Sequence, residues 1–506
     1  MRKAFDIHPP VFYPSAVIAL LFVGLTITFN EQAERIFGQF QGYMSAHFGW
    51  FLNLSINYYF FFVLALGFSA LGRTRIGGPR ARPEFSRFSW VAMLFSAGMG
   101  IGLVYFSVAE PLLNYAHPLE SDFSDLEKAR YAMRNTFFHY GVHVWGIYCL
   151  LGIALAYFCF NRGLPLSLRS TLQPLLGDRI HGPIGNSLDT LAVLATLFGL
   201  ATSLGFGAVQ FSTGVARMFG LENGVNLQVI SIVCITSIAI VSVLSGIGRG
   251  IRYLSNLNIG LAIVLFFFVL FIGQTASLLN GFVESLGIYL DEFFPMSTFR
   301  GHYADSGDWF TDWSMFYWAW WVSWSPFVGT FIARISRGRT IREIALFGLI
   351  LPALSSFLWM SIFGNTALDM QMTGQLDLAS AVQEDSSTVL FLVLDELPLS
   401  TTTAFLSIFL VATFFITSSD SGSLVVDLMT SGGKLDSPYG QKVFWASLEG
   451  AVAIALLIGG GLSALQSASI STGFPFAVVL VLVSWSLVRG IRNDRLPGGD
   501  SGTKRS

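Results

Sequence analysis

The segment Phe316–Phe327, with the sequence FYWAWWVSWSPF, carries the strongest structural signal in the chain. Half of the 12 tryptophans lie between Trp309 and Trp324, and no charged residue interrupts the segment. On a helix, positions i, i+3, i+4 and i+7 share one face. That face carries four aromatic side chains: Tyr317, Trp320, Trp321 and Trp324.

An uncharged aromatic face suits a cation that cannot donate hydrogen bonds, such as a quaternary ammonium. Each ring attracts such a cation by roughly 0.5–2 kcal/mol, most strongly when the cation is desolvated. The alternative is an aromatic belt at the membrane surface, but a belt would place rings at both ends of many segments. We therefore favour a ligand box.

The composition is that of a polytopic membrane protein. The 506 residues are 53% hydrophobic and 12% charged, with a mean hydropathy of +0.61, whereas soluble domains carry about 25% charged residues. The formal net charge of -2 gives no indication of nucleic-acid binding. The 3 cysteines lie in apolar segments at unrelated spacings, which indicates neither a disulfide framework nor a zinc site. The first residues lack a signal-peptide cleavage pattern, so we expect the first apolar segment to remain as a membrane helix.

Apolar runs of about 20 residues, long enough to span a bilayer, recur along the whole chain. They predict twelve membrane helices, near 12–32, 49–72, 88–114, 134–160, 187–217, 227–248, 254–280, 313–334, 343–366, 402–428, 441–465 and 472–489. The segment 281–300 is amphipathic and too interrupted to span, so we expect an interfacial helix there.

Charged residues in the loops alternate with the predicted spans. Arginine or lysine clusters follow every even-numbered span, as in 73–87 and 334–342, whereas the loops after spans three, seven and nine are acidic. Basic loops stay in the cytoplasm, so we expect both chain termini there. No nucleotide-binding loop or soluble domain is recognisable, which leaves an ion gradient or the substrate's own gradient as the energy source.

The third span contains three glycines at alternate positions, Gly98, Gly100 and Gly102. Small residues that pack between helices normally recur every four residues, whereas a spacing of two places glycines on different faces. We therefore expect unwound backbone, which a membrane tolerates only beside a cavity or site. We also expect the eighth span to be interrupted at Pro326. Because spans three and eight are five apart, the pattern predicts two inverted five-helix repeats with a binding site at their interface.

Aromatic and ionisable side chains in other spans are further candidates. Tyr140, Trp145 and Tyr148 fall within an arc of about 140° on the fourth span, and either add walls to the box or pack in the core. Glu110 and Asp420 are ionisable groups in or near spans, so each is either functional or a structural group at a helix end.

Hydroxyl groups inside spans are candidate sodium ligands. Thr417 and Ser418 in the tenth span either supply oxygen ligands or bond back to their own helix, and Thr202 and Ser203 are weaker candidates. Two histidines one turn apart lack the further ligands that a metal site needs, so we expect a structural role for them. They are His139 and His143.

Three motifs together resemble the betaine/carnitine/choline transporter family. They are Gly98–Gly102 followed by Glu110 and Pro111, Trp318–Trp321 continuing to Arg334–Arg339, and Ala412–Ser418 followed by Asp420–Gly422. The resemblance covers nearly the whole chain. It implies a leucine-transporter-like core of two inverted five-helix repeats, preceded by two extra helices, in trimers in a bacterial cytoplasmic membrane. It implies uptake of trimethylammonium or related onium compounds for osmoprotection, and it does not imply an enzyme.

This resemblance divides the chain into five parts. Residues 1–87 hold the N-terminal tail and two peripheral helices, and 88–280 form the first repeat. Residues 281–312 contain the interfacial helix and a loop, 313–489 form the second repeat, and 490–506 are a short cytoplasmic tail.

The resemblance also implies which residues bind the substrate. The matched central positions are Trp320, Trp321 and Trp324, opposite the stretch with Met99, Gly100 and Gly102; Tyr140, Trp145 and Tyr148 form a further aromatic group, and Phe316 and Phe327 occupy gate-like positions. In sodium-coupled members, a sodium site is formed by backbone near Ser96, Met99 and Phe414 together with Thr417 and Ser418. Members that exchange without sodium place a methionine or a basic group there. The hydroxyls favour Na⁺ as the coupling ion, and no transition metal is expected.

Two positions bear on the substrate. Position 140 is Tyr where betaine-type members commonly have Trp, and position 102 is Gly where choline-specific members tend to carry Asp. A carboxylate there would balance the charge of choline, whereas a zwitterion brings its own. We therefore expect glycine betaine or dimethylsulfoniopropionate. The alternatives are sodium-independent exchange of carnitine-type or betaine-type compounds, choline uptake, and a channel or receptor with an aromatic cage.

Overall fold

The computed structural model describes residues 5–98, 100–245, 250–302, 308–434 and 437–495. Within these ranges every regular element is a helix, and one isolated bridge pairs Arg75 with Thr340. The all-helical fold that the sequence predicts is therefore confirmed.

The helices follow one another closely along the chain. The first are α1 (Pro9–Thr28), α2 (Asn30–Phe68), η1 (Ala70–Arg73), α3 (Arg87–Gly98), α4 (Ile101–Ala116), α5 (Asp125–Tyr140) and α6 (Val142–Phe160). The next are α7 (Leu168–Thr171), α8 (Gln173–Leu176), η2 (Gly177–His181), α9 (Pro183–Phe219), α10 (Val225–Ser245), α11 (Gly250–Ile272), α12 (Thr275–Asp291) and α13 (Phe293–Thr298). The last are α14 (Asp308–Ile335), α15 (Ile341–Met372), α16 (Leu378–Glu384), α17 (Val389–Asp395), α18 (Ser400–Thr430), α19 (Tyr439–Ile458) and α20 (Gly461–Arg495).

Many of these helices have the length and composition of membrane spans. Within the described ranges 9 are long and apolar enough, or 10 if the bent pair Asn256–Ile272 and Thr275–Asp291 counts as one span. Two expected spans fall outside this count. The third span is divided into α3 and α4, and each of these helices is too short to be counted. The eighth span is α14, whose tryptophans and tyrosines lower its mean hydropathy. A helix or helix pair covers each expected apolar segment, and twelve spans remain a prediction.

The end of the seventh segment differs from the expectation. The axis of α12 lies at 107° to that of α11, and α12 begins at Thr275 rather than near 281. The chain turns here because Gly273 follows α11 and the Thr275 hydroxyl donates to the Leu270 carbonyl, 2.8 Å away. The expected interfacial segment thus corresponds to α12 and α13.

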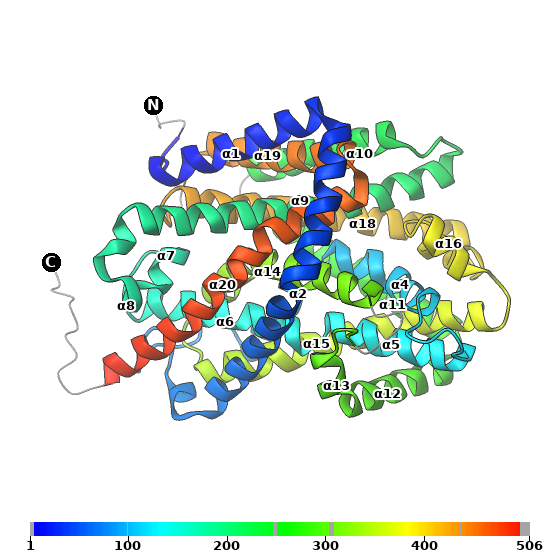
Figure 1. The fold of residues 1–506 in the computed structure, drawn as a ribbon, viewed down its shortest axis with the longest axis horizontal. Helices are drawn as coiled ribbons and strands as arrows, with labels where there is room; N and C mark the ends of the chain where they lie inside the picture. Colours follow the sequence, from blue (N-terminus) through cyan, green and yellow to red (C-terminus); the bar gives the residue numbers. More distant parts are fainter. Residues whose placement is uncertain (1–4, 99, 246–249, 303–307, 435–436, 496–506) are drawn as a thin grey trace.

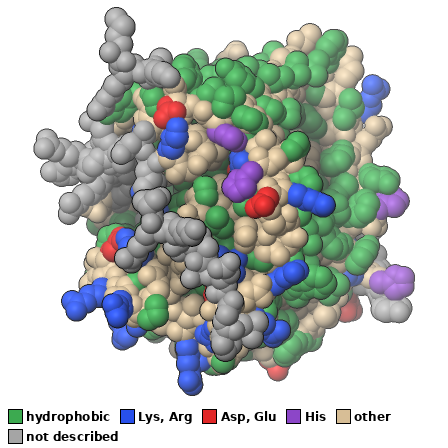
Figure 2. Space-filling view, turned by 90° about the vertical axis from the view of Figure 1, so that its left-hand side faces the viewer, with side chains coloured by type: hydrophobic (Ala, Val, Ile, Leu, Met, Phe, Trp, Pro, Cys, Tyr) green, Lys and Arg blue, Asp and Glu red, His purple; other side chains and the backbone are tan. Residues whose placement is uncertain are grey.

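The long helices run side by side, and α2 crosses over them (Figure 1). Close packing joins α14 to α6, α20 and α9, and α18 to α9. The start of α1 and the end of α20 lie at the end of the molecule that carries α7 and α8 (Figure 1). Figure 2 looks onto that end, where Lys and Arg side chains gather.

The third apolar segment is divided at its glycines. α3 ends at Gly98, and α4 begins at Ile101 after Gly100, whose backbone is extended at φ -132° and ψ -169°. The expected break in the helix is therefore present around Gly100, while Met99 lies outside the described residues.

The expected interruption at Pro326 is wrong, because α14 continues through this residue to Ile335. Proline has no N–H and so leaves the carbonyl four residues earlier, that of Val322, without its helical donor. The Ser325 hydroxyl donates to this carbonyl at 2.6 Å. The side chain before the proline thus replaces the missing donor and keeps the helix continuous.

Candidate functional site

A small buried cavity lies where the divided segment meets α14. Four elements line it, α4 with the residues just before it, α5, α9 and α14. The lining residues are Gly100, Gly102, Leu103, Tyr140, Ser203, Trp320, Trp321 and Trp324. The cavity volume is about 10 Å³, which is the room that one water molecule needs. None of the lining residues is charged.

Four of these side chains form the aromatic box: Tyr140, Trp320, Trp321 and Trp324. Trp320 and Trp321 stack with ring centroids 4.6 Å apart and planes 12° apart. Tyr140 meets Trp321 edge-on, with centroids 5.5 Å apart and planes at 78°. The helical spacing seen in the sequence therefore brings three of the four expected α14 rings to one cavity; Tyr317 does not line it, and Tyr140 of α5 is the fourth ring.

All three indole N–H groups of the box donate hydrogen bonds to other groups of the protein. Trp320 Nε1 donates to Ser203 Oγ at 3.2 Å. Trp321 Nε1 donates to the His139 carbonyl at 3.0 Å, and Trp324 Nε1 to the Gly199 carbonyl at 2.9 Å. These bonds fix the orientation of each ring. They also leave no free indole donor for a ligand, so the box offers π surface rather than hydrogen bonds.

Glycine is required opposite the box because the rings approach the backbone closely. A Cβ atom at Gly102 would lie 2.7 Å from Trp320 Cη2, and one at Gly100 would lie 3.1 Å from Trp324 Cη2. Contacts below 3.0 Å force something to move. The glycines therefore serve two purposes, since they allow the break in the helix and make room for the indoles.

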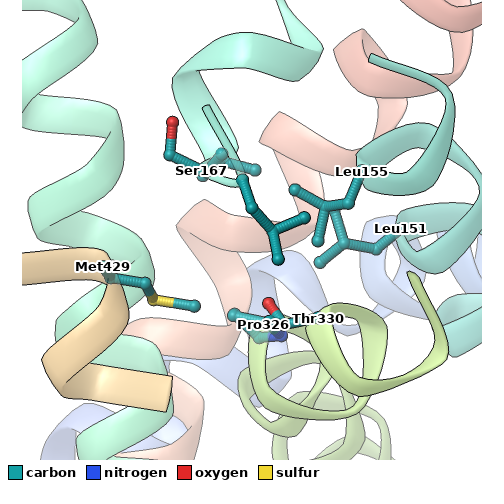
Figure 3. A pocket seen from close by; sticks show the side chains of 8 residues that line it. Leu151, Leu155, Ser167, Pro326, Thr330 and Met429 are labelled. Atoms are coloured by element: carbon teal, nitrogen blue, oxygen red, sulfur yellow. The ribbon is translucent and has the colours of Figure 1, made fainter. Parts of the chain in front are cut away.

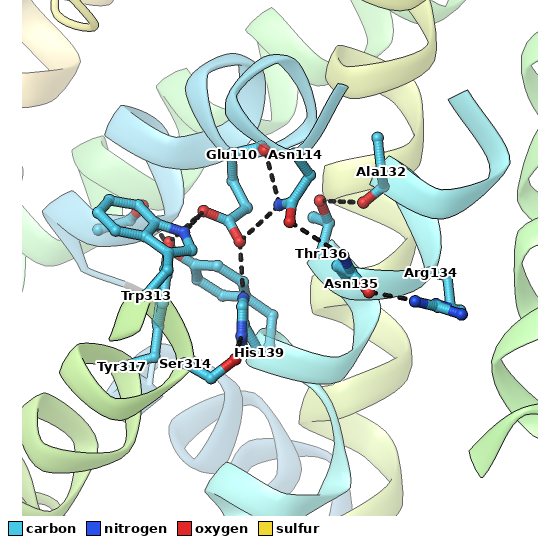
Figure 4. A network of polar contacts seen from close by, with 12 residues as sticks. Glu110, Asn114, Ala132, Arg134, Asn135, Thr136, His139, Trp313, Ser314 and Tyr317 are labelled. Carbon is cyan, nitrogen blue, oxygen red and sulfur yellow. Dashed lines mark hydrogen bonds and ion pairs between the residues drawn. The ribbon is translucent and has the colours of Figure 1, made fainter. Parts of the chain in front are cut away.

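A buried polar network is centred on Glu110 (Figure 4). The Glu110 side chain is fully buried and accepts hydrogen bonds from Trp313 Nε1 at 2.7 Å, Tyr317 OH at 2.9 Å and Asn114 Nδ2 at 2.9 Å. His139 Nδ1 lies 2.7 Å from Glu110 Oε1. A carboxylate in an apolar interior needs such donors to offset its lost hydration.

Two tyrosines connect this network to the aromatic box. The hydroxyls of Tyr317 and Tyr140 lie 3.3 Å apart, and Tyr140 OH donates to the Gly102 carbonyl at 3.2 Å. Glu110 thus helps to position Tyr140 and the backbone of α4. The sequence pattern singled out Glu110 but did not indicate these partners.

The histidines take structural roles in the region that the structure describes. His139 Nε2 lies 2.8 Å from Ser314 Oγ, and His143 Nε2 lies 3.2 Å from Asn57 Oδ1 and 3.1 Å from Ser297 Oγ. Among the described residues, no group of three or more His, Cys, Asp or Glu side chains is arranged to hold a metal ion.

The other aromatic candidates surround the box without lining its cavity. Phe316 stacks on Trp320 with centroids 5.4 Å apart, and Phe327 meets Trp324 edge-on at 5.5 Å. Trp145 and Tyr148 pack edge-on against each other on α6, at 5.6 Å. Phe316 and Phe327 therefore contact rings of the box directly, whereas Trp145 and Tyr148 form a separate pair on α6.

Figure 3 shows a second small cavity. Its lining residues come from α6, the following loop, α7, α14 and α18: Leu151, Leu155, Leu166, Ser167, Leu168, Pro326, Thr330 and Met429. Leu151 and Leu155 follow Tyr148 on the same helix, and Pro326 follows Trp324. The two cavities therefore lie in succession along α14, which lines both.

The proposed sodium ligands are only partly described. The Thr417 hydroxyl donates to the carbonyls of Thr413 at 2.9 Å and Phe414 at 3.1 Å, and Ser418 is half-buried. Met99 lies outside the described residues, and only the backbone of Ser96, in α3, is described.

The weaker sodium candidates bond to other partners. Thr202 Oγ1 lies 2.9 Å from Ser469 Oγ and also donates to the carbonyls of Phe198 at 2.8 Å and Leu465 at 2.9 Å. Ser203 holds the Trp320 indole, a role that the sequence did not reveal because it depends on how α9 packs on α14.

Comparison with known proteins places this geometry in a family. The sequence model of the betaine/carnitine/choline family of transporters matches residues 10–496. The chain is 45% identical over 502 residues to glycine betaine transporter 1 of Vibrio parahaemolyticus, covering 98% of this chain and 95% of that protein. It is 44% identical over 501 residues to a glycine betaine/proline/choline/ectoine transporter of the same species, covering 97% and 89%. It is 43% identical over 468 residues to a glycine betaine transporter of Bacillus subtilis, covering 92% and 91%. The chain therefore belongs to the betaine/carnitine/choline transporter family.

Proposed function

We propose that this membrane transporter takes up a zwitterionic onium solute, glycine betaine or dimethylsulfoniopropionate, by sodium symport with alternating access. The observation that carries the proposal is the aromatic box. Its three indoles and one phenol converge on one buried cavity, and no charged side chain lines it. A permanently charged, methylated head group gains attraction from several rings there without needing a hydrogen-bond acceptor.

The helix start beside the box favours a zwitterion. Gly100 precedes α4 and provides no side-chain cap, and both Gly100 and Gly102 line the cavity. The first N–H groups of a helix and its dipole attract an anionic group. In divided membrane helices such ends receive substrate carboxylates. A betaine would place its ammonium among the rings and its carboxylate at the start of α4.

The surroundings of Gly102 disfavour a cation that lacks a carboxylate. The nearest acidic group of the network, Glu110, is already engaged by His139 and three other donors. A side chain at position 102 would collide with Trp320. Choline would therefore have no counter-charge in the box. Those matched relatives whose names state a substrate all include glycine betaine, and two of them also include choline.

Binding must widen the box. A trimethylammonium group is several times larger than the one water that the cavity of about 10 Å³ admits. Opening toward one side of the membrane and then the other is the behaviour expected of two five-helix repeats that move against each other. We propose this arrangement here, with twelve spans, a leucine-transporter-like core and a homotrimer.

The proposed orientation follows from the charges. The basic loops, the start of α1 and the end of α20 belong to one end of the molecule, and Lys and Arg side chains gather there (Figure 2). Basic loops face the cytoplasm. We therefore propose that this end faces the cytoplasm, in the inner membrane of a bacterium.

Competition for uptake tests the substrate. Radiolabelled glycine betaine is supplied to cells that lack their own betaine transporters but express this protein, together with unlabelled glycine betaine, dimethylsulfoniopropionate, choline, carnitine or ectoine. We expect the first two to compete best and choline to be about tenfold weaker, because it loses an interaction of about 1.4 kcal/mol at the start of α4. Choline competing as well as glycine betaine would contradict the zwitterion assignment.

Uptake into empty proteoliposomes tests the coupling. An inward sodium gradient should drive concentrative glycine betaine uptake, and replacing Na⁺ with K⁺ should abolish it. An exchanger would instead need internal substrate and would not respond to sodium. Replacing Thr417 and Ser418 together with Ala should raise the sodium concentration for half-maximal uptake; an unchanged requirement would remove both residues from the site.

A further inference from the structure

A second polar cluster lies away from the aromatic box, where α10, α18 and α19 pack together. It contains two carboxylates, Asp420 on α18 and Glu449 on α19, and each residue is only 1% exposed. The two carboxylates repel each other. Neither belongs to the box or to the network of Glu110.

The charges of this cluster do not balance within the described part of the chain. Lys442, on α19, is 3% exposed and acts electrostatically on both Asp420 and Asp427. Asp427 is satisfied by hydrogen bonds from Ser437 and Gln441. The described residues thus place one ammonium among three carboxylates. An unbalanced buried charge is costly, and either a proton on one carboxylate or a bound cation would offset it.

Several oxygen atoms at the cluster have no hydrogen-bond partner among the described residues. They include both carboxylate oxygens of Glu449 and Oδ1 of Asp420. The fully buried Ser419 hydroxyl lies beside Glu449 and interacts with this carboxylate. Native proteins rarely leave so many buried polar atoms unsatisfied in one place.

A third helix directs hydroxyl groups at the same place. Thr236 Oγ1, on α10, is without a partner in the described region and would lie 2.8 Å from a Cβ atom at Gly450, the residue after Glu449. From the same helix, the Ser242 hydroxyl donates to Asp420 Oδ2 at 2.7 Å. Hydroxyl groups of α10 therefore lie close to both helices that carry the carboxylates: Ser242 bonds to Asp420 on α18, and Thr236 lies against Gly450 on α19.

We propose that Asp420 and Glu449, with the hydroxyls of Ser419 and Thr236, bind a sodium ion. The donors are all oxygen atoms, which suit a hard cation, and the cluster contains no sulfur or imidazole for a transition metal. A cation there would reduce the unbalanced negative charge and occupy the unpartnered oxygens.

The position of the cluster suggests its place on the ion's route. Asp420 lies one turn after Thr417 on α18, in the direction of the helix end at Thr430. That end is followed by the basic loop with Lys434. This site would hold sodium between the ligands at Thr417 and Ser418 and the cytoplasm. This placement rests on the sodium-coupled uptake proposed above.

Equilibrium binding of radioactive sodium to the purified full-length transporter, with potassium as the background salt, tests the proposal. We expect Glu449→Gln to bind one sodium ion fewer per protomer than the wild type. The double variant Thr417→Ala, Ser418→Ala should lose a different ion, so that combining all three substitutions removes both. Asp395→Asn is the control, because this carboxylate on α17 pairs with Arg217 outside the cluster, and it should retain wild-type sodium binding.

Sodium binding by Glu449→Gln with the stoichiometry and affinity of the wild type would overturn the proposal. Should this variant fail to fold, Ser419→Ala keeps both carboxylates, and we expect it to weaken sodium binding severalfold; unchanged affinity would again overturn the site.

The experiments distinguish a failure of this sodium site from a failure of the proposed sodium-coupled uptake. If uptake proved independent of sodium, the symport proposal would fail, whereas loss of bound sodium in Glu449→Gln would still support this site. If uptake depended on sodium but Glu449→Gln bound sodium normally, only the site at Asp420 and Glu449 would be excluded.

Discussion

Replacing Gly102 with Ala adds a single methyl group to the wall of the aromatic box. Its Cβ atom would lie 2.7 Å from Trp320 Cη2, and ordinary contact begins at 3.4 Å, so the indole must withdraw. Trp320 has little room to do so. It is stacked between Trp321, at 4.6 Å, and Phe316, at 5.4 Å, and its Nε1 donates to Ser203.

The expected loss of affinity follows from this clash. Inserting a methyl group into a packed site costs about 1–3 kcal/mol, which corresponds to about 5- to 150-fold weaker binding. The loss should show in the dissociation constant of glycine betaine, measured on purified protein by calorimetry or by the change in tryptophan fluorescence. Size-exclusion profiles and melting curves would show that the variant still folds.

A graded series of glycine variants separates the clash from a general effect of alanine. Gly100→Ala places its Cβ atom 3.1 Å from Trp324 Cη2, a milder contact, so its effect should be smaller than that of Gly102→Ala. Gly260→Ala, in α11, meets nothing within 4 Å and should bind as the wild type does. Equal affinity in all three variants would refute the close packing of indoles on this backbone.

Three further substitutions test other parts of the site. Trp321→Leu should abolish most uptake while the protein still inserts into the membrane, because it removes a ring of the box; uptake at the wild-type rate would exclude Trp321 from binding. Ser203→Ala removes the acceptor of the Trp320 indole and should weaken binding by about tenfold or less, as expected for one hydrogen bond. Glu110→Gln leaves His139 without its charged partner and should lower the melting temperature in detergent, whereas an unchanged melting curve would show that the network adds no stability.

Some of this architecture could be predicted from the sequence because it depends on local geometry. Helical spacing alone determines that Trp320, Trp321 and Trp324 lie near one another on α14, and glycines at alternate positions disfavour a continuous helix. The all-helical fold follows from the long apolar runs. These features need no knowledge of which helices pack together.

Other features depend on contacts between distant segments. The bond from Tyr140 OH to the Gly102 carbonyl and the bond from Trp320 to Ser203 each join two helices that no spacing rule relates. The continuity of α14 at Pro326 depends on the Ser325 side chain, whose hydroxyl reaches the Val322 carbonyl. The proline rule alone therefore predicted an interruption that the structure does not have.

The central claim is that the box recognises the positive charge of the methylated head group, and an analogue of the same shape with an uncharged head group tests it most directly. In 3,3-dimethylbutyrate a tert-butyl group replaces the trimethylammonium of glycine betaine, and the carboxylate is kept. Calorimetric titration of the purified transporter would compare the two compounds. Attraction by several rings predicts that glycine betaine binds at least about tenfold more tightly, a difference of about 1.4 kcal/mol. Equal binding of the two compounds would contradict the claim, since the rings would then serve only as an apolar surface.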